Sequence, residues 1–524
     1  MSWRATTIAS LFLGCGSGMA MPARGQEAID AGTLAEIRKE LSELRAENRE
    51  LRQRLDEISA AQSTVARAAP APASAAPSTT APTPGAQPPS PPPQMAEATP
   101  PPPGPLSHPL AAPVRYPTEA GDPYASAQST QSYGAFSPGR GFKIADTPNA
   151  ELNVSAYLLG RYINQLPADE LSFVDHNGRT RPIDPRRDIQ LQRMMVWLSG
   201  WAIDPKFHFQ TIFWSVNSTN QVAIAGALTY HFNEAIEIGI GINRLPGSYT
   251  MMGSHPYWFA PDRVLADEFF RPGMTSGIWA TGEVLPRLHY FAMLGDNLSQ
   301  LGISAVKLTR HNAKGLALWW MPTTGEFGPR GGMGDSEYHT QLATRFGAHY
   351  VHSREDRFNQ ADISSPDNTQ IRLSDSTLFF ETGSLAPGVT IDEADFNLVA
   401  VNAGFKYRGW ALHTEGYYRW LTSFDADGPL PLQTVKDKGF YVQGSYDILP
   451  RTLQLYTGTS QIYGQFGDSS EYFLGANWYP SKTRNLKVNA MVIRVIDSSV
   501  SSVFGYYVGG QDGVTLTASI DLLY

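Results

Sequence analysis

The sequence has very little cysteine, little charge and no long hydrophobic run. Its 524 residues contain one cysteine, Cys15, so an internal disulfide is excluded. Charged residues make up 17% of the chain, which is low for a soluble protein, and the net charge of −8 argues against nucleic acid as a partner. Beyond the N-terminal segment no run of about 18 apolar residues occurs, so only strands could cross a membrane.

Residues 1–20 predict a secretory signal peptide. Arg4 supplies the positive start, residues 8–14 a short apolar stretch, and residues 18–20 a small-x-small cleavage site. The alternative is a lipoprotein signal in which Cys15 is lipidated. Either signal sends the chain out of the cytoplasm.

Residues 27–62 predict a coiled coil. Apolar residues recur at alternating spacings of three and four, which gives a heptad seam. Asn48 sits at an a position, where it fixes the register at a cost in stability. The alternative is a lone charged helix, but such a helix would expose its leucines. We expect a parallel trimer, although Asn48 would also suit a dimer. The seam consists of Leu34, Ile37, Leu41, Leu44, Asn48, Leu51, Leu55 and Ile58.

Residues 63–139 are rich in Pro and Ala and predict a semi-rigid spacer without a core. From residue 140 to residue 524 the texture changes to short segments with period-2 alternation, which is typical of strands with two different faces. About sixteen strands are expected, near 151–165, 188–202, 206–217, 221–232, 234–244, 274–282, 286–294, 312–321, 337–351, 395–407, 409–422, 437–447, 451–462, 470–479, 484–496 and 513–524.

The connections between these strands alternate in length. Tight turns follow most even-numbered strands and long loops follow most odd-numbered ones, with a short connection near 217–220 and a long one near 322–336 as exceptions. Short turns on one side and long loops on the other are typical of an outer-membrane barrel. The last strand, which ends in the aromatic Tyr524, is expected to pair with the first and leave no free edge. The fold class is therefore all-β, a transmembrane sixteen-stranded antiparallel barrel.

The length of one predicted strand matches the height of the apolar band of a membrane barrel. The even-numbered residues from Trp410 to Trp420 share one face, while His413, Glu415 and Arg419 share the other. Ten steps of about 3.3 Å, tilted by about 40°, rise about 25 Å, which matches the distance between two aromatic girdles. The alternative is a sandwich strand with a Trp in the core, but a core would not accept three charged or polar residues on one face.

Three stretches carry a family resemblance. The stretch 193–214 (RMMVWLSGWAIDPKFHFQTIFW), the stretch 237–250 (EIGIGINRLPGSYT) and the hairpin 471–490 (EYFLGANWYPSKTRNLKVNA) resemble the phosphate-selective porin O/P family. This resemblance implies a trimer of passive pores with a preference for anions. The N-terminal helix is similar to that of related trimeric porins.

One observation argues against strong anion selectivity. Residues 1–139 contain 10 Lys and Arg and 12 Asp and Glu, and subtracting these from totals of 41 and 49 leaves 31 and 37, a net charge of −6 in the barrel.

Alternation places eight charged or titratable residues on the inward face of the barrel wall, where they would line the pore and set its selectivity. Their alternative role is bracing, in which cross-strand pairs merely satisfy buried charge. These residues are Arg161, Arg193, Glu237, Arg345, His349, Glu415, Arg419 and Lys487.

The third long loop is rich in aromatic residues, which a solvent-exposed loop seldom carries so close together. Folding into the lumen would bury them and narrow the pore, and the alternatives are an external lid or a trimer contact. Its charged residues are the expected constriction residues Asp262, Arg263, Asp267, Glu268 and Arg271.

These observations predict a porin in the outer membrane of a Gram-negative bacterium. It would pass small hydrophilic solutes or ions, with anions such as phosphate as one option, as a homotrimer in outer-membrane lipid. The helix would lie in the periplasm and reach toward peptidoglycan. A tether between membrane and peptidoglycan is the alternative function, and a barrel enzyme is a third. No catalytic residue, cofactor or metal ligand is predicted.

Overall fold

The computed structural model describes residues 136–137, 140–166, 171–216, 221–301, 312–328, 332–360, 369–502 and 504–524. The chain divides into two compact units, Met1–Leu106 and Ser107–Tyr524, and all described residues belong to the second. The predicted signal peptide with Cys15, the coiled coil with Asn48 and nearly all of the linker lie outside the described residues.

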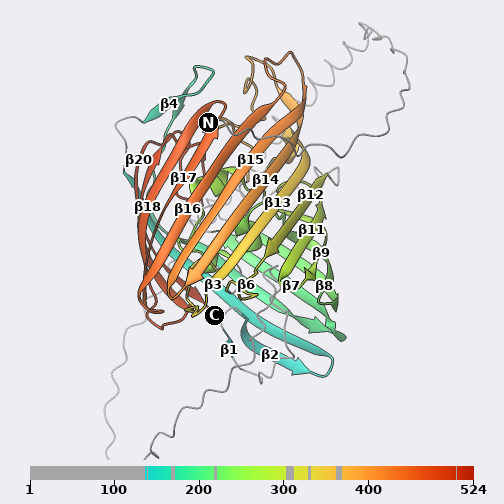
Figure 1. The fold of residues 1–524 in the computed structure, drawn as a ribbon. Helices are drawn as coiled ribbons and strands as arrows, with labels where there is room; N and C mark the ends of the chain where they lie inside the picture. The colour runs from blue at the N-terminus through green and yellow to red at the C-terminus, as the bar shows by residue number, and fades with distance from the viewer. Residues whose placement is uncertain are drawn as a thin grey trace, which may run out of the picture. The chain divides into compact units, whose positions relative to one another are not determined.

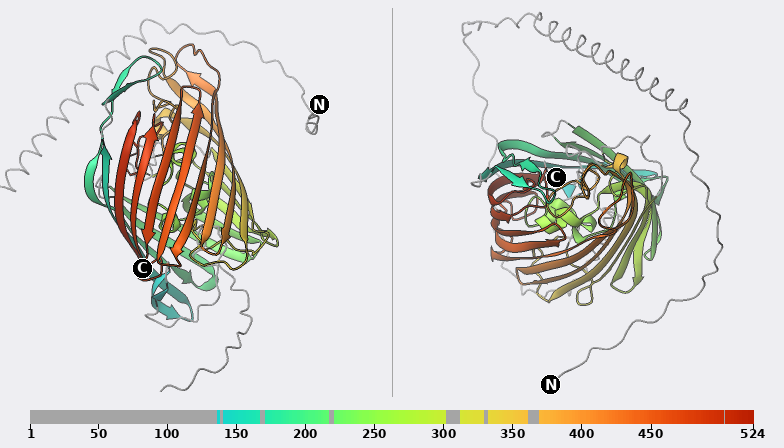
Figure 2. Two further views of the ribbon diagram at one scale, coloured as in Figure 1. Left: turned by 60° about the vertical axis from the view of Figure 1, so that its left-hand side comes forward. Right: turned by 90° about the horizontal axis from the view of Figure 1, so that it is seen from above.

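The described strands form one closed antiparallel barrel (Figures 1 and 2). Eighteen strands share the sheet, and sixteen close the barrel once the short β1 and β2 are set aside, so the predicted strand number is confirmed. Closure occurs between β20 and β3, where Ser519 lies opposite Arg161. The barrel strands are β3 (Ala150–Leu166), β6 (Arg187–Ala202), β7 (Asp204–Val216), β8 (Gln221–Asn233), β9 (Ile236–Arg244), β10 (Met274–Leu285), β11 (Leu288–Gly295), β12 (Ala313–Trp320), β13 (Ala343–Asp356), β14 (Ile391–Tyr407), β15 (Trp410–Ala426), β16 (Val435–Leu449), β17 (Leu453–Gly464), β18 (Gly467–Trp478), β19 (Leu486–Ile496) and β20 (Gly513–Leu523).

Two short strands precede the strands of the barrel wall. β1 (Phe136–Ser137) lies just before residue 140, where the barrel region was expected to begin, and it pairs with β2 (Gly141–Thr147). β2 pairs with the first part of β3, and β20 pairs with the remainder. At this junction the Tyr524 amide donates to the Ala156 carbonyl at 2.9 Å. The two pairings together cover one edge of the long strand β3.

The two faces of the barrel wall have opposite chemistry. On β15 the exposed positions Trp410, Leu412 and Tyr418 alternate with buried His413 and Glu415. Trp410 is 60% exposed and stacks on Tyr446 of β16 at a ring-centroid distance of 4.3 Å. Apolar and aromatic side chains outside and polar side chains inside are typical of a barrel in a bilayer. No helix among the described residues is long and apolar enough to cross a membrane.

The turns at one end are tight because their residues accept a left-handed backbone. Arg408 and Gly409, which connect β14 to β15, have φ values of 49° and 84°. Two central residues with positive φ form the turn that best matches the twist of a hairpin. The exception at this end is the segment 321–342 between β12 and β13, which was the long connection expected from the sequence.

At the other end, a small hairpin that the sequence did not predict packs against a loop. β4 (Ser172–Val174) and β5 (Thr180–Pro182) form a separate two-stranded sheet. Arg179 and Arg181 beside this turn both contact Glu381, at 3.0 and 2.8 Å. The loop that contains Glu381 lies between η4 (Arg357–Asn359) and β14.

Candidate functional site

The loop between β9 and β10, residues 245–273, folds into the lumen of the barrel. It contains α2 (Tyr249–Met252), η1 (His255–Tyr257) and α3 (Leu265–Phe270). The view from above in Figure 2 shows this light-green segment inside the ring of strands. Its large apolar side chains are buried, with Phe259 at 1% and Phe270 at 0% exposure. The loop therefore lies inside the barrel, and the alternative of an external lid does not apply.

The loop crosses the lumen and is fixed to the opposite wall. In the strand order β17 and β18 lie half-way around the barrel from β9 and β10. The Leu265 amide donates to Glu471 Oε2 on β18 at 2.8 Å, and the Ala266 amide donates to Ser460 Oγ on β17 at 2.7 Å. These contacts satisfy backbone amides at the start of α3, which otherwise have no partner within the helix. Glu471 thus holds the loop across the pore.

A second set of contacts fixes the loop to β3 and β6. Arg161 Nη1 donates to Asp262 Oδ2 at 2.6 Å, and Arg193 contacts the other oxygen of the same carboxylate. Arg193 Nη1 also donates to the Pro261 carbonyl at 3.1 Å. The structure therefore brings together two of the predicted wall residues and one of the predicted loop residues.

The remaining charged loop residues pair with one another. Arg271 binds both oxygens of Glu268, at 2.8 and 2.9 Å. Arg263 lies 3.3 Å from Asp267 and over the ring of Trp258 at 4.7 Å. Burial raises the pKa of Asp267, even though Arg263 lies beside it. Burial also acts to raise the pKa of Glu268, but Arg271 outweighs it and lowers that pKa.

The remaining wall residues brace the barrel or the loop. Arg345 lies over the ring of Tyr249 at 4.5 Å, and Arg419 pairs with Asp437 at 2.7 Å. Lys487 lies 3.7 Å from Asp521. The placement of the other three is similar. His349 Nδ1 donates to the Pro246 carbonyl, Glu415 accepts from the Tyr249 amide, and Glu237 lies near His231.

The segment 321–342 supports the constriction from the side of the tight turns. The Met333 amide donates to the Tyr257 carbonyl at 3.1 Å. His339 joins the two ends of the segment, because its Nε2 lies 2.6 Å from Glu326 and its Nδ1 contacts Asp335. Burial acts to lower the pKa of His339, but these two carboxylates raise it to about 9. The imidazole is therefore a cation at neutral pH.

The same segment contains a group with metal-binding residue types. Asp335, Glu337 and His339 offer ligand atoms that lie within 4.8 Å of one another. Both ring nitrogens of His339 already contact carboxylates, and a protonated imidazole has no lone pair for a metal. The cluster is therefore described best as an ion-pair clasp.

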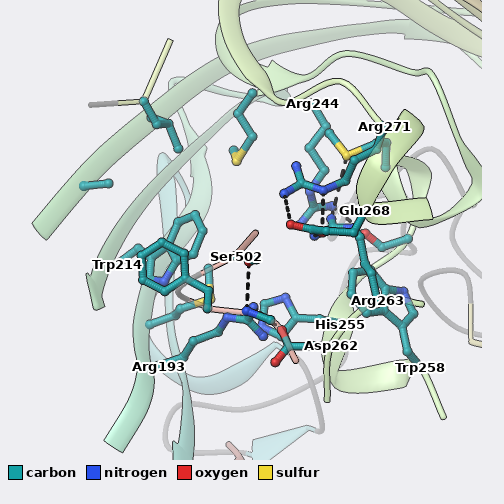
Figure 3. Close-up of a pocket in the computed structure, with 18 of the residues that line it drawn as sticks. Arg193, Trp214, Arg244, His255, Trp258, Asp262, Arg263, Glu268, Arg271 and Ser502 are labelled. Atoms are coloured by element: carbon teal, nitrogen blue, oxygen red, sulfur yellow. Dashed lines mark hydrogen bonds and ion pairs between the residues drawn. The ribbon is translucent and has the colours of Figure 1, made fainter. Parts of the chain in front are cut away.

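Between the loop and the wall of β6 to β10 lies a cavity (Figure 3). Figure 3 shows Arg193 beside Asp262 and Arg271 beside Glu268. Four arginines and two carboxylates line the cavity, a formal excess of two positive charges. Burial lowers the pKa of His255, so this imidazole adds no charge. The charged lining residues are Arg193, Arg244, Arg263, Arg271, Asp262 and Glu268.

The wall side of this cavity is largely apolar. Met195, Ile212, Trp214 and Ala225 come from β6, β7 and β8, and Met274 comes from β10. Sequence reasoning did not identify these residues or the lining segment around Phe504. It also missed Arg244, although the quoted stretch 237–250 contains it. Alternation alone shows that a residue faces inward, but not which inward residues remain uncovered by the loop.

No family model and no curated protein matches this chain. Among solved structures, the chain is similar to OmpT, an outer-membrane protein of Vibrio cholerae, with 11% identity and a TM-score of 0.45, over 73% of this chain and 99% of that one. The anion-selective porin from Comamonas acidovorans has 10% identity and a TM-score of 0.43, over 72% and 100%. The outer-membrane channel DcaP of Acinetobacter baumannii has 10% identity and a TM-score of 0.42, over 73% and 99%. This chain's own strand order and apolar exterior show the fold of a sixteen-stranded outer-membrane-type β-barrel.

Proposed function

We propose that this protein is a passive outer-membrane channel that prefers small anionic solutes. The observation that carries the proposal is the excess of arginine in the cavity beside the constriction loop. The barrel region as a whole has a net charge of −6, from 31 basic and 37 acidic residues in 140–524. Charges at the narrowest point act on a passing ion over a few Å, whereas charges at the mouths are screened by salt within about 10 Å. Local placement therefore outweighs the total.

The lining also favours one kind of anion. Arginine binds carboxylate and phosphate through two parallel hydrogen bonds, so either group suits the charged side of the cavity. The facing wall carries Ile212, Trp214 and Met274, which contact an apolar body better than water. An organic carboxylate thus matches both sides, whereas inorganic phosphate matches only one. The phosphate preference implied by the motif resemblance is the weaker option.

Reversal potentials in planar lipid bilayers test the proposal. In a potassium chloride gradient, the full chain should give a reversal potential whose sign shows a preference for anions. Benzoate should permeate better than phosphate. Arg244→Gln should lower the anion-to-cation permeability ratio by about twofold to fivefold, since a unit charge at about 4 Å in water contributes about 1 kcal/mol. Arg187→Gln, an exposed arginine at the start of β6, is the matched control. A cation-side potential in the wild-type channel would refute the proposal.

We further propose that the channel is a homotrimer that associates through the face of β6 to β10. The exposed large apolar side chains of these strands are aliphatic, Met or Phe, such as Ile224, Ile238 and Ile278. The exposed side chains of β12 to β18 include Trp410 and Trp478. Trp and Tyr are enriched where a barrel meets the lipid headgroups, so a face whose highly exposed side chains include neither suits contact with other copies. Cross-linking of an Ile238→Cys variant should give covalent oligomers, and a Val442→Cys variant should not.

A further inference from the structure

We propose that Arg161 and Arg193 form an oxyanion-binding site that the carboxylate of Asp262 occupies as a tethered ligand, and that a carboxylate or phosphate group of a solute displaces it. This inference rests on the proposed anion channel and adds a regulatory role to the same site. The carboxylate of Asp262, which belongs to the constriction loop, would then block the path of anions through the channel.

The three side chains form a compact buried unit. Arg161 is 1% exposed, and Arg193 and Asp262 are each 6% exposed. Arg161 comes from β3 and Arg193 from β6, two neighbouring strands of the rigid wall, whereas Asp262 comes from the inserted loop. One carboxylate bridges the two guanidinium groups, with one oxygen toward each arginine. This is the arrangement in which two arginines would hold the oxyanion of a bound solute.

The carboxylate leaves part of the arginine capacity unused. Arg161 Nε and Nη2 and Arg193 Nε are buried and have no hydrogen-bond partner among the described residues. A buried donor without a partner destabilises the folded state, because it has lost its hydrogen bonds to water. Two guanidinium groups against one carboxylate also leave one positive charge, so the site attracts a further anion. Asp262 is thus an incomplete ligand that a free oxyanion can replace.

The exchange leaves the loop anchored. Displacing Asp262 breaks its contacts with the two arginines, while the Leu265 and Ala266 amides keep their acceptors on β18 and β17. The exchange also replaces one carboxylate by another group of the same charge, so the charge balance at the two arginines stays the same. Arg193 and Asp262 both line the cavity, so a solute bound in the cavity would lie next to the bridge. A permanent structural ion pair would not need to border the solute path.

Concentration-dependent block of the chloride current by acetate tests the inference. The full chain is inserted into planar bilayers at constant ionic strength, and acetate serves as the oxyanion because its two oxygens can face the two guanidinium groups as those of Asp262 do, whereas chloride offers a single acceptor atom. Asp262→Asn removes the tethered charge but keeps the shape of the side chain, so the half-blocking acetate concentration should fall by about tenfold. Asp204→Asn, which makes the same change in net charge at an exposed turn, should leave that concentration unchanged. The effect of Asp262→Asn should vanish when Arg161→Met and Arg193→Met are added.

A measurement on the wild-type chain covers the case in which Asp262→Asn does not fold. Hydrogen exchange in residues 258–264 should become faster in acetate than in chloride, because acetate releases Asp262 from the wall. Equal exchange in the two salts, or a change in half-blocking concentration of less than twofold in a folded Asp262→Asn channel, would overturn the inference. The proposed function would survive that result, since it fails only if the wild-type reversal potential lies on the cation side.

Discussion

The ion-pair clasp of His339 makes the stability of the segment 321–342, which supports the loop 245–273, dependent on pH. The pKa of His339 is raised from an ordinary value of 6.5 to about 9, so the folded segment binds the proton more tightly than the released segment. The stabilisation is complete below pH 6.5 and is lost as the pH rises through about 9. We therefore expect the segment 321–342 to be held most firmly in mild acid and to loosen in alkali.

The size of the effect follows from the pKa difference. A difference of about 2.5 units, at about 1.36 kcal/mol per unit, sets an upper bound of about 3 kcal/mol. The side chain of His339 is 6% exposed and that of Glu326 is 23% exposed, so solvent screening reduces this bound. We expect about 1–2 kcal/mol, which corresponds to a change of about fivefold to thirtyfold in the opening equilibrium of the segment.

Hydrogen exchange, corrected for the intrinsic effect of pH on exchange rates, measures this opening. The Met333 amide, which donates to the Tyr257 carbonyl, should lose protection by about tenfold between pH 6 and pH 9.5. His339→Gln should show low protection at both values. His176→Gln, which removes a histidine that contacts Asp375 at the other end of the barrel, is the matched control. Protection that changes with pH to the same extent in His339→Gln would refute the reasoning.

Three further predictions concern the loop and the N-terminal region. Glu471→Ala leaves the Leu265 amide without its acceptor, so the loop should be destabilised by about 1–3 kcal/mol and single-channel recordings should show more frequent open-level fluctuations. In Gly439→Val the new Cβ would lie 2.5 Å from the ring of Phe270, so α3 should be displaced and the channel conductance should rise. An unchanged conductance would mean that α3 does not limit the pore. If the proposed trimer associates mainly through its barrel walls, deletion of residues 27–62 should leave the trimer intact in gentle detergent. Insertion as monomers only would assign the association to the predicted coiled coil.

The sequence by itself determined the barrel. Each wall strand has one face toward lipid and one toward the lumen, so apolar and polar residues alternate with period 2 along the strand's sequence. The tight turns, such as Arg408-Gly409, are also local, since they depend on the φ values of two residues. For the same reason the inward position of Arg161, Arg345 or Lys487 follows from counting along a strand. The short β1 and β2 escaped notice because they lie beside the Pro-rich stretch and show too few alternations.

The tertiary structure alone decided which inward residues line the cavity beside the loop. Arg345, Arg419 and Lys487 have the same alternation as Arg193, yet they brace the wall or the loop, because the loop 245–273 crosses the lumen and covers their side. The bridge from Asp262 to Arg161 joins residues 101 positions apart, and no local pattern specifies such a contact. The total charge of the barrel is a sum over the sequence, whereas the local excess of arginine in the cavity depends on which side chains the folded loop leaves uncovered.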